Sequence, residues 1–354
     1  MTRAWVEIDL GALRRNAAAM AARGAALLPM VKADAYGLGA VAVARALDAL
    51  APWGFGVATI AEGIELRESG IERPIIVFTP VHRSHLRALC NARLTPALGA
   101  ASDITEWSEI TTAPWHLAID TGMSRAGVRW DHVHTLRDAI RANPPQGAFT
   151  HFHSAELDDG SREEQERRFR DAVAQLPVRP PLLHAENSAA LARTHRSSWD
   201  IARPGIFLYG VGSGERALVH PEPVVRLRAP IVDIRTTLPG ESVSYDATYR
   251  VSAQRRIATL AIGYADGYRR SLSNRGVALL HGQRVPVAGL VTMDMTMIDV
   301  TGVPCDVGDI VTLIGRDGSE LLDVETVARL ADLSPYELLT GLRPRLERHY
   351  RDEP

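Results

Sequence analysis

The strongest constraint on the fold is a repeated alternation of short apolar runs with amphipathic stretches in the N-terminal part of the chain. Eight apolar runs occur, at residues 27–31, 54–57, 74–78, 94–98, 115–119, 148–152, 181–184 and 199–203. Several intervals between them have helical periodicity, for example 38–50, 61–69 and 162–175. Short strands that alternate with helices pair in parallel, and eight such units close a (β/α)8 barrel. The sequence therefore predicts an α/β protein with a TIM-type barrel over residues 1–225; a doubly wound open sheet is the alternative and usually needs fewer units.

The pattern changes after residue 225, where β-branched residues dominate and most helical periodicity is lost. Residues 226–234 and 309–314 predict strands, and residues 277–287 predict a hairpin that turns at Gly282 and Gln283. Helical periodicity returns at residues 324–330 and 335–342. We therefore expect a second, mostly β domain over residues 226–354. Because no Gly/Ser-rich or Pro-rich linker separates the two domains, we expect them to pack together.

Composition argues against several classes of protein. The formal net charge of −2 gives no basic surface for nucleic acid. No apolar run approaches the ~20 residues that cross a bilayer, and Glu7 and Asp9 fall where a signal peptide needs apolar residues. Cys90 and Cys305 lie far apart without neighbouring Cys or His ligands, so we expect neither a disulfide framework nor a metal site. These features predict a cytoplasmic protein that binds neither nucleic acid nor membrane.

Residues just past the C-terminal ends of barrel strands line the active site in this fold. The residues at these positions are Lys32, Asp120 with Arg125, His151, Asn187 with Ser188, and Arg203. Lysine can attack a carbonyl group as a Schiff-base nucleophile, although Lys32 is equally consistent with a solvated residue after a strand. Gly205 and Ile206 follow the eighth strand, where barrel loops often bind phosphate. Gly205 is also compatible with a simple turn.

Several longer motifs resemble those of the alanine racemase family. They are Val31-Lys32-Ala33-Asp34-Ala35-Tyr36-Gly37, Asp120-Thr121-Gly122-Met123-Ser124-Arg125, Thr150-His151-Phe152, His184 with Asn187-Ser188, Arg203-Pro204-Gly205-Ile206, Gly263-Tyr264-Ala265-Asp266-Gly267-Tyr268 and Met293-Asp294. The motifs occur in family order over nearly the whole chain. The resemblance implies a PLP-dependent (fold-type III) amino-acid racemase that interconverts L-alanine and D-alanine and supplies D-alanine for cell walls.

The resemblance also implies roles for individual residues. Lys32 would carry pyridoxal 5′-phosphate (PLP) and act as the base on one face of the α-carbon, and Tyr264 would act on the other face. His151 would assist the tyrosine. Tyr36, Ser188, Gly205 and Ile206 would bind the cofactor phosphate, and Arg125 and Met293 would bind the substrate carboxylate. The family places Tyr264 and Met293 in the active site of a partner subunit, so we expect a head-to-tail homodimer whose β domain completes the partner's site.

Arg203 indicates which reaction the cofactor would favour. It matches the arginine that faces the pyridine nitrogen of the cofactor, supported by His184. Most PLP enzymes place a carboxylate there to keep that nitrogen protonated. Arginine does not give up its proton, so the nitrogen stays unprotonated and return of a proton to the α-carbon is favoured over transamination.

Several positions depart from the usual alanine racemase pattern. Ala118 stands where many members have a carbamylated lysine that orients Arg125. The other departures are Leu290, Thr292, Pro344, the segment Arg345-Leu346-Glu347-Arg348, His153 and Glu156. They leave open a serine or broad-specificity racemase. A non-catalytic PLP-binding protein is a second alternative, which the β domain disfavours. An amino-acid decarboxylase is a third, which Arg203 disfavours.

Overall fold

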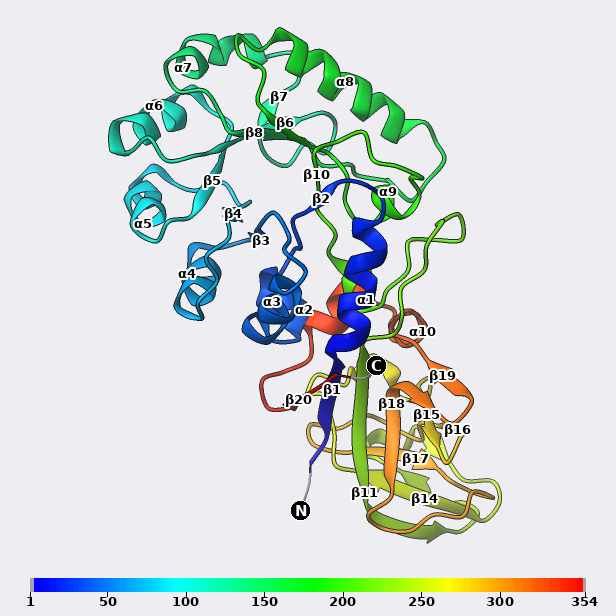
Figure 1. Cartoon of the computed structure of the whole chain (residues 1–354). Helices are drawn as coiled ribbons and strands as arrows, with labels where there is room; N and C mark the ends of the chain where they lie inside the picture. Colours follow the sequence, from blue (N-terminus) through cyan, green and yellow to red (C-terminus); the bar gives the residue numbers. More distant parts are fainter. Residues whose placement is uncertain (1–2, 353–354) are drawn as a thin grey trace.

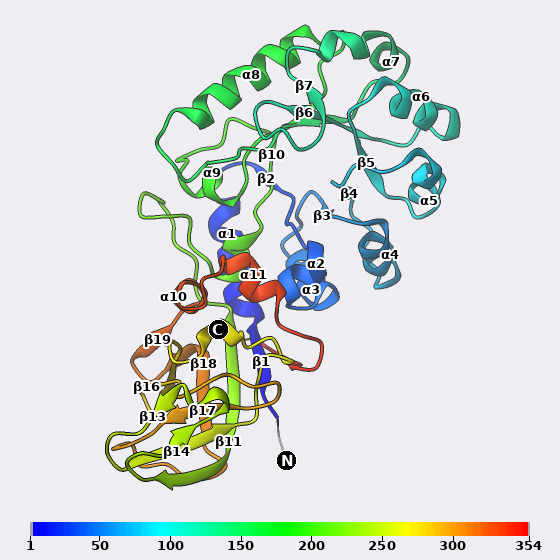
Figure 2. The same ribbon diagram turned by 180° about the vertical axis from the view of Figure 1, so that it is seen from behind.

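The computed structural model describes residues 3–352, which form two lobes joined by long strands (Figure 1). The barrel lobe runs from α1 (Leu10–Ala21) to η3 (Ile206–Tyr209), and the β lobe contains β1 (Trp5–Asp9) and everything from β11 (Val225–Thr237) onward. Figure 2 shows from behind that α11 (Pro335–Thr340) lies where the two lobes meet. Buried apolar side chains of both lobes, such as Tyr209 and Leu313, belong to one continuous core.

Eight parallel strands form the barrel. They are β2 (Ala26–Leu27), β3 (Phe55–Val57), β4 (Ile75–Val77), β5 (Thr95–Leu98), β6 (His116–Asp120), β8 (Gly147–Phe149), β9 (Leu182–His184) and β10 (Ile201–Ala202). The strands from β3 to β9 pair in sequence order, and β10 pairs with β2. Single bridges from Met30 to Gly56 and from Asn187 to Arg203 close the ring. The predicted (β/α)8 barrel and its eight strands are confirmed. A short strand, β7 (Val128–Arg129), pairs with β6 outside the ring.

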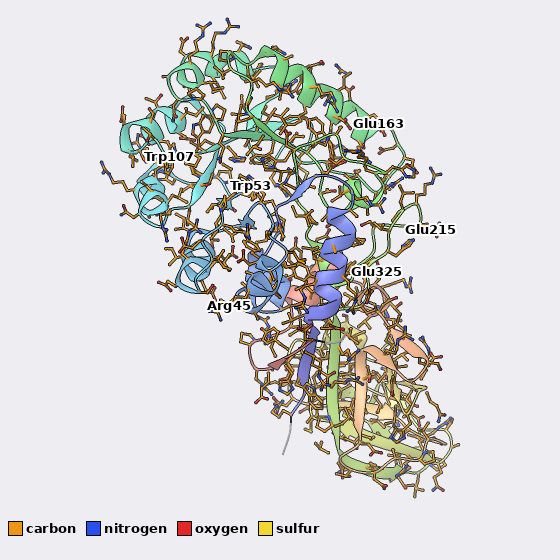
Figure 3. All side chains as sticks on the ribbon, viewed as in Figure 1. Arg45, Trp53, Trp107, Glu163, Glu215 and Glu325 are labelled. Atoms are coloured by element: carbon orange, nitrogen blue, oxygen red, sulfur yellow. The ribbon has the colours of Figure 1, made fainter. Side chains whose placement is uncertain are left out.

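Helices cover the outside of the barrel (Figure 1). They are α3 (Ala40–Asp48), α4 (Ile60–Glu68), α5 (Leu86–Asn91), α6 (Ala101–Ile110), α7 (Arg137–Ala142), α8 (Ser161–Gln175) and α9 (Ser188–Ala192). Local signals start and anchor them. Thr59 and Glu62 form a capping box at the start of α4. The indole of Trp107, labelled in Figure 3, is fully buried under α6 and donates to the Ala113 carbonyl at 2.9 Å.

The N-terminal strand belongs to the β lobe, because β1 pairs antiparallel with β11 and parallel with β20 (Glu347–Arg351). Asp9 then caps α1 by accepting a hydrogen bond from the Ala12 amide at 2.9 Å. The chain therefore starts in one lobe and turns at Asp9 into the other. The sequence pattern predicts neither β1 nor α1.

The β lobe is built on a nine-stranded sheet. Besides β1, β11 and β20 it contains β14 (Arg255–Leu260), β15 (Val277–Leu280), β16 (Gln283–Pro286), β17 (Thr296–Asp299), β18 (Ile310–Asp317) and β19 (Glu320–Leu322). A separate hairpin joins β12 (Ser242–Val243) to β13 (Tyr249–Arg250). The mostly β character is confirmed, and α10 (Val324–Leu330) and α11 lie near the predicted helices.

The predicted turn of the β15–β16 hairpin was wrong by one residue. Leu280 pairs with Gln283, so His281 and Gly282 form the turn. Both have positive φ, 52° and 72°, as a two-residue type I′ hairpin turn requires. The first residue of such a turn is usually Asn, Asp or Gly. Because position 281 is a histidine, the sequence pattern places the start of the turn one residue too late, at Gly282. In residues 3–352 no helix is both long and apolar enough to cross a membrane.

Candidate active site

Lys32 opens a left-handed turn, here called the lysine turn (residues 32–37), two residues after the Met30 bridge that continues from β2. Ala33, Asp34, Ala35 and Tyr36 have φ between 51° and 58°, in the left-handed helical region. Each L-residue in this conformation is disfavoured by roughly 1–2 kcal/mol, and consecutive ones are rare. Strain of this kind persists only where surrounding contacts hold it, and it is concentrated at functional sites.

Contacts from both lobes hold the lysine turn. The Ala33 amide donates to the Glu62 carboxylate at 2.8 Å, and the Asp34 carboxylate accepts from the Ala40 amide at 2.7 Å. From the β lobe, Arg348 donates to the Gly37 carbonyl at 3.0 Å. A side chain at Gly37 would lie 2.6 Å from the Leu339 carbonyl, so α11 packs directly on the turn. The position of Lys32 is therefore set by α4 and by the C-terminal segment together.

Lys32 is the only lysine among the 354 residues. Burial lowers its pKa below the ordinary value, the nearby positive charge of Arg125 lowers it further, and Glu62 opposes both. A lowered pKa increases the fraction of free amine, which is the form that attacks a carbonyl carbon. Lys32 thus has the environment expected of a nucleophilic amine.

Arg203 lies in the barrel just past β10, with an exposed fraction of 4%. One terminal nitrogen donates to Nδ1 of His184 at 2.9 Å and to the His184 carbonyl at 2.8 Å. The other donates to the carbonyls of Thr150 at 2.6 Å and Ala185 at 3.1 Å. A guanidinium carries five N–H groups, so only Nε–H lacks an acceptor within residues 3–352. Burial lowers the pKa of Arg203 to about 9, which leaves it positively charged at neutral pH.

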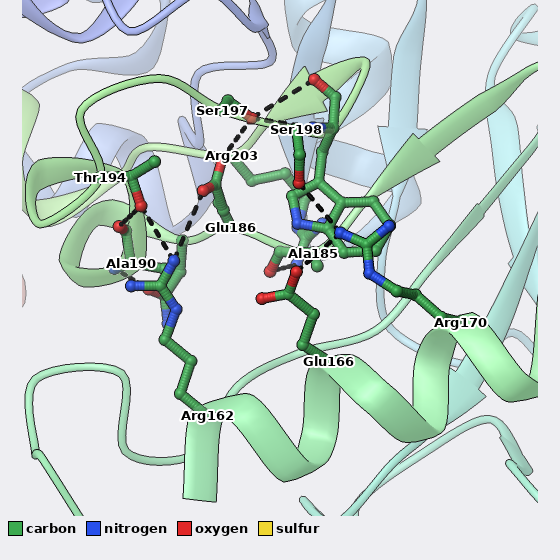
Figure 4. Close-up of polar contacts among 12 residues, drawn as sticks. Arg162, Glu166, Arg170, Ala185, Glu186, Ala190, Thr194, Ser197, Ser198 and Arg203 are labelled. Carbon is green, nitrogen blue, oxygen red and sulfur yellow. Dashed lines mark hydrogen bonds and ion pairs between the residues drawn. The ribbon is translucent and has the colours of Figure 1, made fainter. Parts of the chain in front are cut away.

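A buried carboxylate that the sequence analysis missed lies beside Arg203. Glu186 follows β9 and is 1% exposed. Figure 4 shows Ser197 and Arg162 directed toward it; the Ser197 hydroxyl donates at 2.6 Å, and Arg162 lies 3.7 Å away. The charge of Glu186 opposes the lowering of the Arg203 pKa. An acid shortly after the apolar strand residues Leu182 and Leu183 was the available signal, since buried acids need partners.

Tyr36, Ser188, Gly205 and Ile206 meet at the start of η3. The Ser188 hydroxyl accepts from the Gly205 amide at 2.8 Å. A side chain at Gly205 would lie 2.3 Å from the Tyr36 hydroxyl, so glycine is needed for that approach. Within residues 3–352 no atom accepts a hydrogen bond from the Ile206 amide. Two hydroxyls and a free backbone N–H suit a phosphate group.

His151 lies near Lys32, Arg125 and Arg203, and its side chain is neutral. Burial lowers the pKa of His151 to about 3, and the charges of Arg203, Arg125 and Lys32 add to the effect. Arg125 is exposed, and among the described residues it has no hydrogen-bond or ion-pair partner. The methyl group of Ala118 on β6 offers none. The structure thus leaves the cation of Arg125 available to a ligand.

Tyr264 and Met293 lie together on the β lobe. The Tyr264 amide donates to the Thr292 carbonyl at 2.9 Å, and the Ala265 amide to the Met293 carbonyl at 3.0 Å. Their exposed fractions are 42% and 53%. Among residues 3–352 no hydrogen bond, ion pair or ring contact joins either of them to Lys32 or Arg203. The barrel residues of the predicted site are therefore gathered, and these two stand apart from them.

The departures from the family pattern fall mainly on the β lobe and the barrel rim. Leu290 accepts a hydrogen bond from Ser244 through its carbonyl, and Thr292 caps its own loop by accepting from the Met295 amide at 3.2 Å. His153 pairs with its neighbour Ser154, at 2.7 Å between Nδ1 and the hydroxyl. In residues 3–352 no cluster of His, Cys, Asp and Glu could hold a metal ion.

Comparison with known proteins agrees with this geometry. The family models "Alanine racemase, N-terminal domain" and "Alanine racemase, C-terminal domain" match residues 8–213 and 224–350. An alanine racemase of Nostoc sp. is 37% identical over 98% of this chain and 95% of its own, and one of Geobacter sulfurreducens is 38% identical over 97% and 96%.

Solved structures give the same result. Alanine racemase from E. faecalis superposes with a TM-score of 0.92 at 31% identity, over 99% of this chain and 98% of that one. The Bartonella henselae enzyme, solved with covalently bound pyridoxal phosphate, gives a TM-score of 0.92 at 28% identity, over 99% and 100%.

Proposed function

This chain belongs to the alanine racemase family, and from that premise we propose that it interconverts L-alanine and D-alanine with PLP held at Lys32. The observation that carries the proposal is Arg203, whose four terminal N–H groups are occupied and whose Nε–H is free. A permanently charged donor of this kind suits an unprotonated pyridine nitrogen. An amino-acid decarboxylase would be served better by a carboxylate at that position.

The residues present fit the cofactor. Lys32 is the only side-chain amine, the hydroxyls of Tyr36 and Ser188 with the Ile206 amide would hold the phosphate group, and Arg203 would donate to the ring nitrogen. When bound, PLP supplies an electron-withdrawing ring that makes the α-proton of an amino acid acidic. The chain's own residues then hold the substrate and move the proton.

Racemisation requires a proton to leave one face of the α-carbon and to return on the other. We assign Lys32 to one face, because its lowered pKa favours the free amine. We assign Tyr264 to the other, supplied by a second copy of the chain in a homodimer. The support is that Tyr264 and Met293 are exposed, and no described residue links them to the barrel site of their own chain.

Arg125 and Met293 would hold the substrate carboxylate in this proposal. The Arg125 guanidinium is unpaired, and the pKa of His151 is held low, so His151 acts as a neutral neighbour of the tyrosine base. A positive charge nearby, such as that of Arg125, favours loss of the proton from a tyrosine. We further propose that the protein works in the cytoplasm and supplies D-alanine for cell walls.

A substrate panel on the PLP-loaded protein tests the function. We expect alanine to be converted between its enantiomers fastest among alanine, serine, lysine and arginine. Serine or several amino acids exceeding alanine would favour the broad-specificity alternative, for which Leu290, Thr292 and Pro344 are the motivating residues. No conversion of any amino acid would favour a non-catalytic PLP-binding protein.

The single lysine makes cofactor attachment simple to map. Borohydride reduction of the loaded protein followed by peptide mass analysis should place one pyridoxyl group on Lys32 and leave the Lys32→Arg variant unlabelled. Reduction product elsewhere in the wild type would defeat the attachment assignment.

A further inference from the structure

Behind Arg203, the interior of the barrel contains a file of polar side chains whose far end the proposed chemistry does not use. From Arg203 it runs through His184 to His116 at the start of β6 and ends at Gln146, just before β8. His184 and His116 are both 0% exposed. Barrel interiors are usually filled by branched apolar residues, so two buried imidazoles need partners.

The hydrogen bonds of this file have only one possible direction. Arg203 can only donate, so Nδ1 of His184 accepts at 2.9 Å and His184 carries its proton on Nε2. That proton is donated to Nδ1 of His116, 2.8 Å away. His116 then carries its own proton on Nε2 and faces Oε1 of Gln146 at 3.4 Å. Each imidazole is neutral, in agreement with the pKa of His116, which burial lowers to about 4.

The fold makes room for the His116 ring. A side chain on Gly147 would lie 2.4 Å from both Nδ1 and Cε1 of His116. The backbone of Gly147 is not in the left-handed region, so the ring and not the backbone demands glycine there. The Trp53 ring, labelled in Figure 3, also packs near it, with the two ring centroids 5.6 Å apart.

We propose that His116 is a positioning residue for Arg203: by accepting from Nε2 of His184 it fixes the proton of that ring and keeps Nδ1 an acceptor for the guanidinium. Without an acceptor at His116, the Nε2 proton of His184 would be buried without a partner, and only the contact with Arg203 would still favour that position of the proton. A proton on Nδ1 would set two donors face to face and turn Arg203 away. This inference rests on the proposed function, because it concerns how Arg203 meets the pyridine nitrogen.

The test is the 15N resonance of ring-labelled PLP bound to the protein. His116→Leu removes the acceptor, and we expect the resonance to move downfield as the pyridine nitrogen loses its hydrogen bond. His116→Asn keeps an acceptor near Nδ1 and should restore most of the wild-type position. Thermal unfolding of each variant checks that the barrel is folded. An unchanged resonance in folded His116→Leu, or an equal shift in His116→Asn, would overturn the proposal.

Two further variants keep the proposal testable if His116→Leu does not fold. Gly147→Ala should push the His116 ring and shift the resonance in the same direction, and Gln146→Met should shift it less. An unchanged resonance in folded Gly147→Ala contradicts the inference. A wild-type protein that binds no PLP would instead defeat the proposed function, so the two failures are distinguishable.

Discussion

The two lobes present their functional residues in opposite ways. In the barrel lobe, Arg203 is buried and hydrogen-bonded to His184, Thr150 and Ala185, and Lys32 sits on a strained turn held by several hydrogen bonds. On the β lobe, Tyr264 and Met293 stand exposed on two loops that are hydrogen-bonded to each other. Preorganised groups without a ligand or partner are typical of a site completed from outside. This difference is what the proposed shared site requires: the barrel half would bind the cofactor, and the β-lobe half would complete the barrel site of a second chain.

Removing the hydroxyl of Tyr264 should disable only the β-lobe half of the proposed site, and we expect it to have the largest effect on activity. Tyr264→Phe should lower kcat by roughly 10²–10⁴-fold, the range for loss of a general acid–base group. Cofactor attachment at Lys32 should be unchanged, as measured by absorbance. Solvent deuterium should still exchange into one enantiomer of alanine faster than into the other. Equal exchange from both enantiomers would contradict the assignment of the two faces.

Acid should destabilise the barrel through its neutral histidines. The folded pKa values of His116 and His151, about 4 and about 3, lie below the unfolded value near 6.5. The unfolded state therefore binds more protons below pH 6.5, and stability falls as the pH drops from 6.5 toward 4. For His116 the loss reaches roughly 3 kcal/mol at pH 4. Urea unfolding at several pH values gives the free energy of unfolding at each pH. We expect this free energy to fall less steeply between pH 6.5 and pH 4 in His116→Asn than in the wild type.

Weakening the contacts of the loop that carries Tyr264 should lower the free energy of unfolding less than acid does. Asp266 is 1% exposed, accepts from the Gly263 amide at 2.9 Å, and pairs with Arg345 at 2.8 Å and Arg3 at 3.2 Å. Both arginines are well exposed, so the ion pairs are screened. We expect Asp266→Asn to lower the free energy of unfolding by about 1–2 kcal/mol and to lower kcat while leaving cofactor attachment intact. Loss of attachment would show that the two halves are not separate.

The smallest effect concerns the lysine turn. Ala33 is exposed and has φ 53°, so Ala33→Gly removes left-handed strain and should change stability by between roughly 0 and +1 kcal/mol. The matched control is exposed Ala18 in α1, where the same substitution should destabilise by about 1 kcal/mol. Equal losses in both variants would show that the turn is not strained.

Much of the barrel could be predicted from the sequence, because each strand is a short apolar run whose periodicity is local. The lysine turn could not, since Ala33 to Tyr36 contains no glycine to signal positive φ. The family resemblance predicts His184 beside Arg203, but not His116 and Gln146, because positions 116, 146 and 184 become neighbours only when the barrel closes. The strand β1 was missed because its partners β11 and β20 are distant in sequence. The boundary predicted at residue 225 and the roles of Lys32, Tyr264 and the other site residues remain predictions.

Mixing two inactive variants tests the central claim most directly. If each active site combines the barrel of one chain with the β lobe of another, a dimer of Lys32→Ala with Tyr264→Phe has one doubly altered site and one intact site. Co-refolding equal amounts of the two variants should therefore restore racemisation to roughly a quarter of the wild-type rate, since random pairing makes half of the dimers mixed. Activity that stays at the level of the separate variants would contradict the shared site.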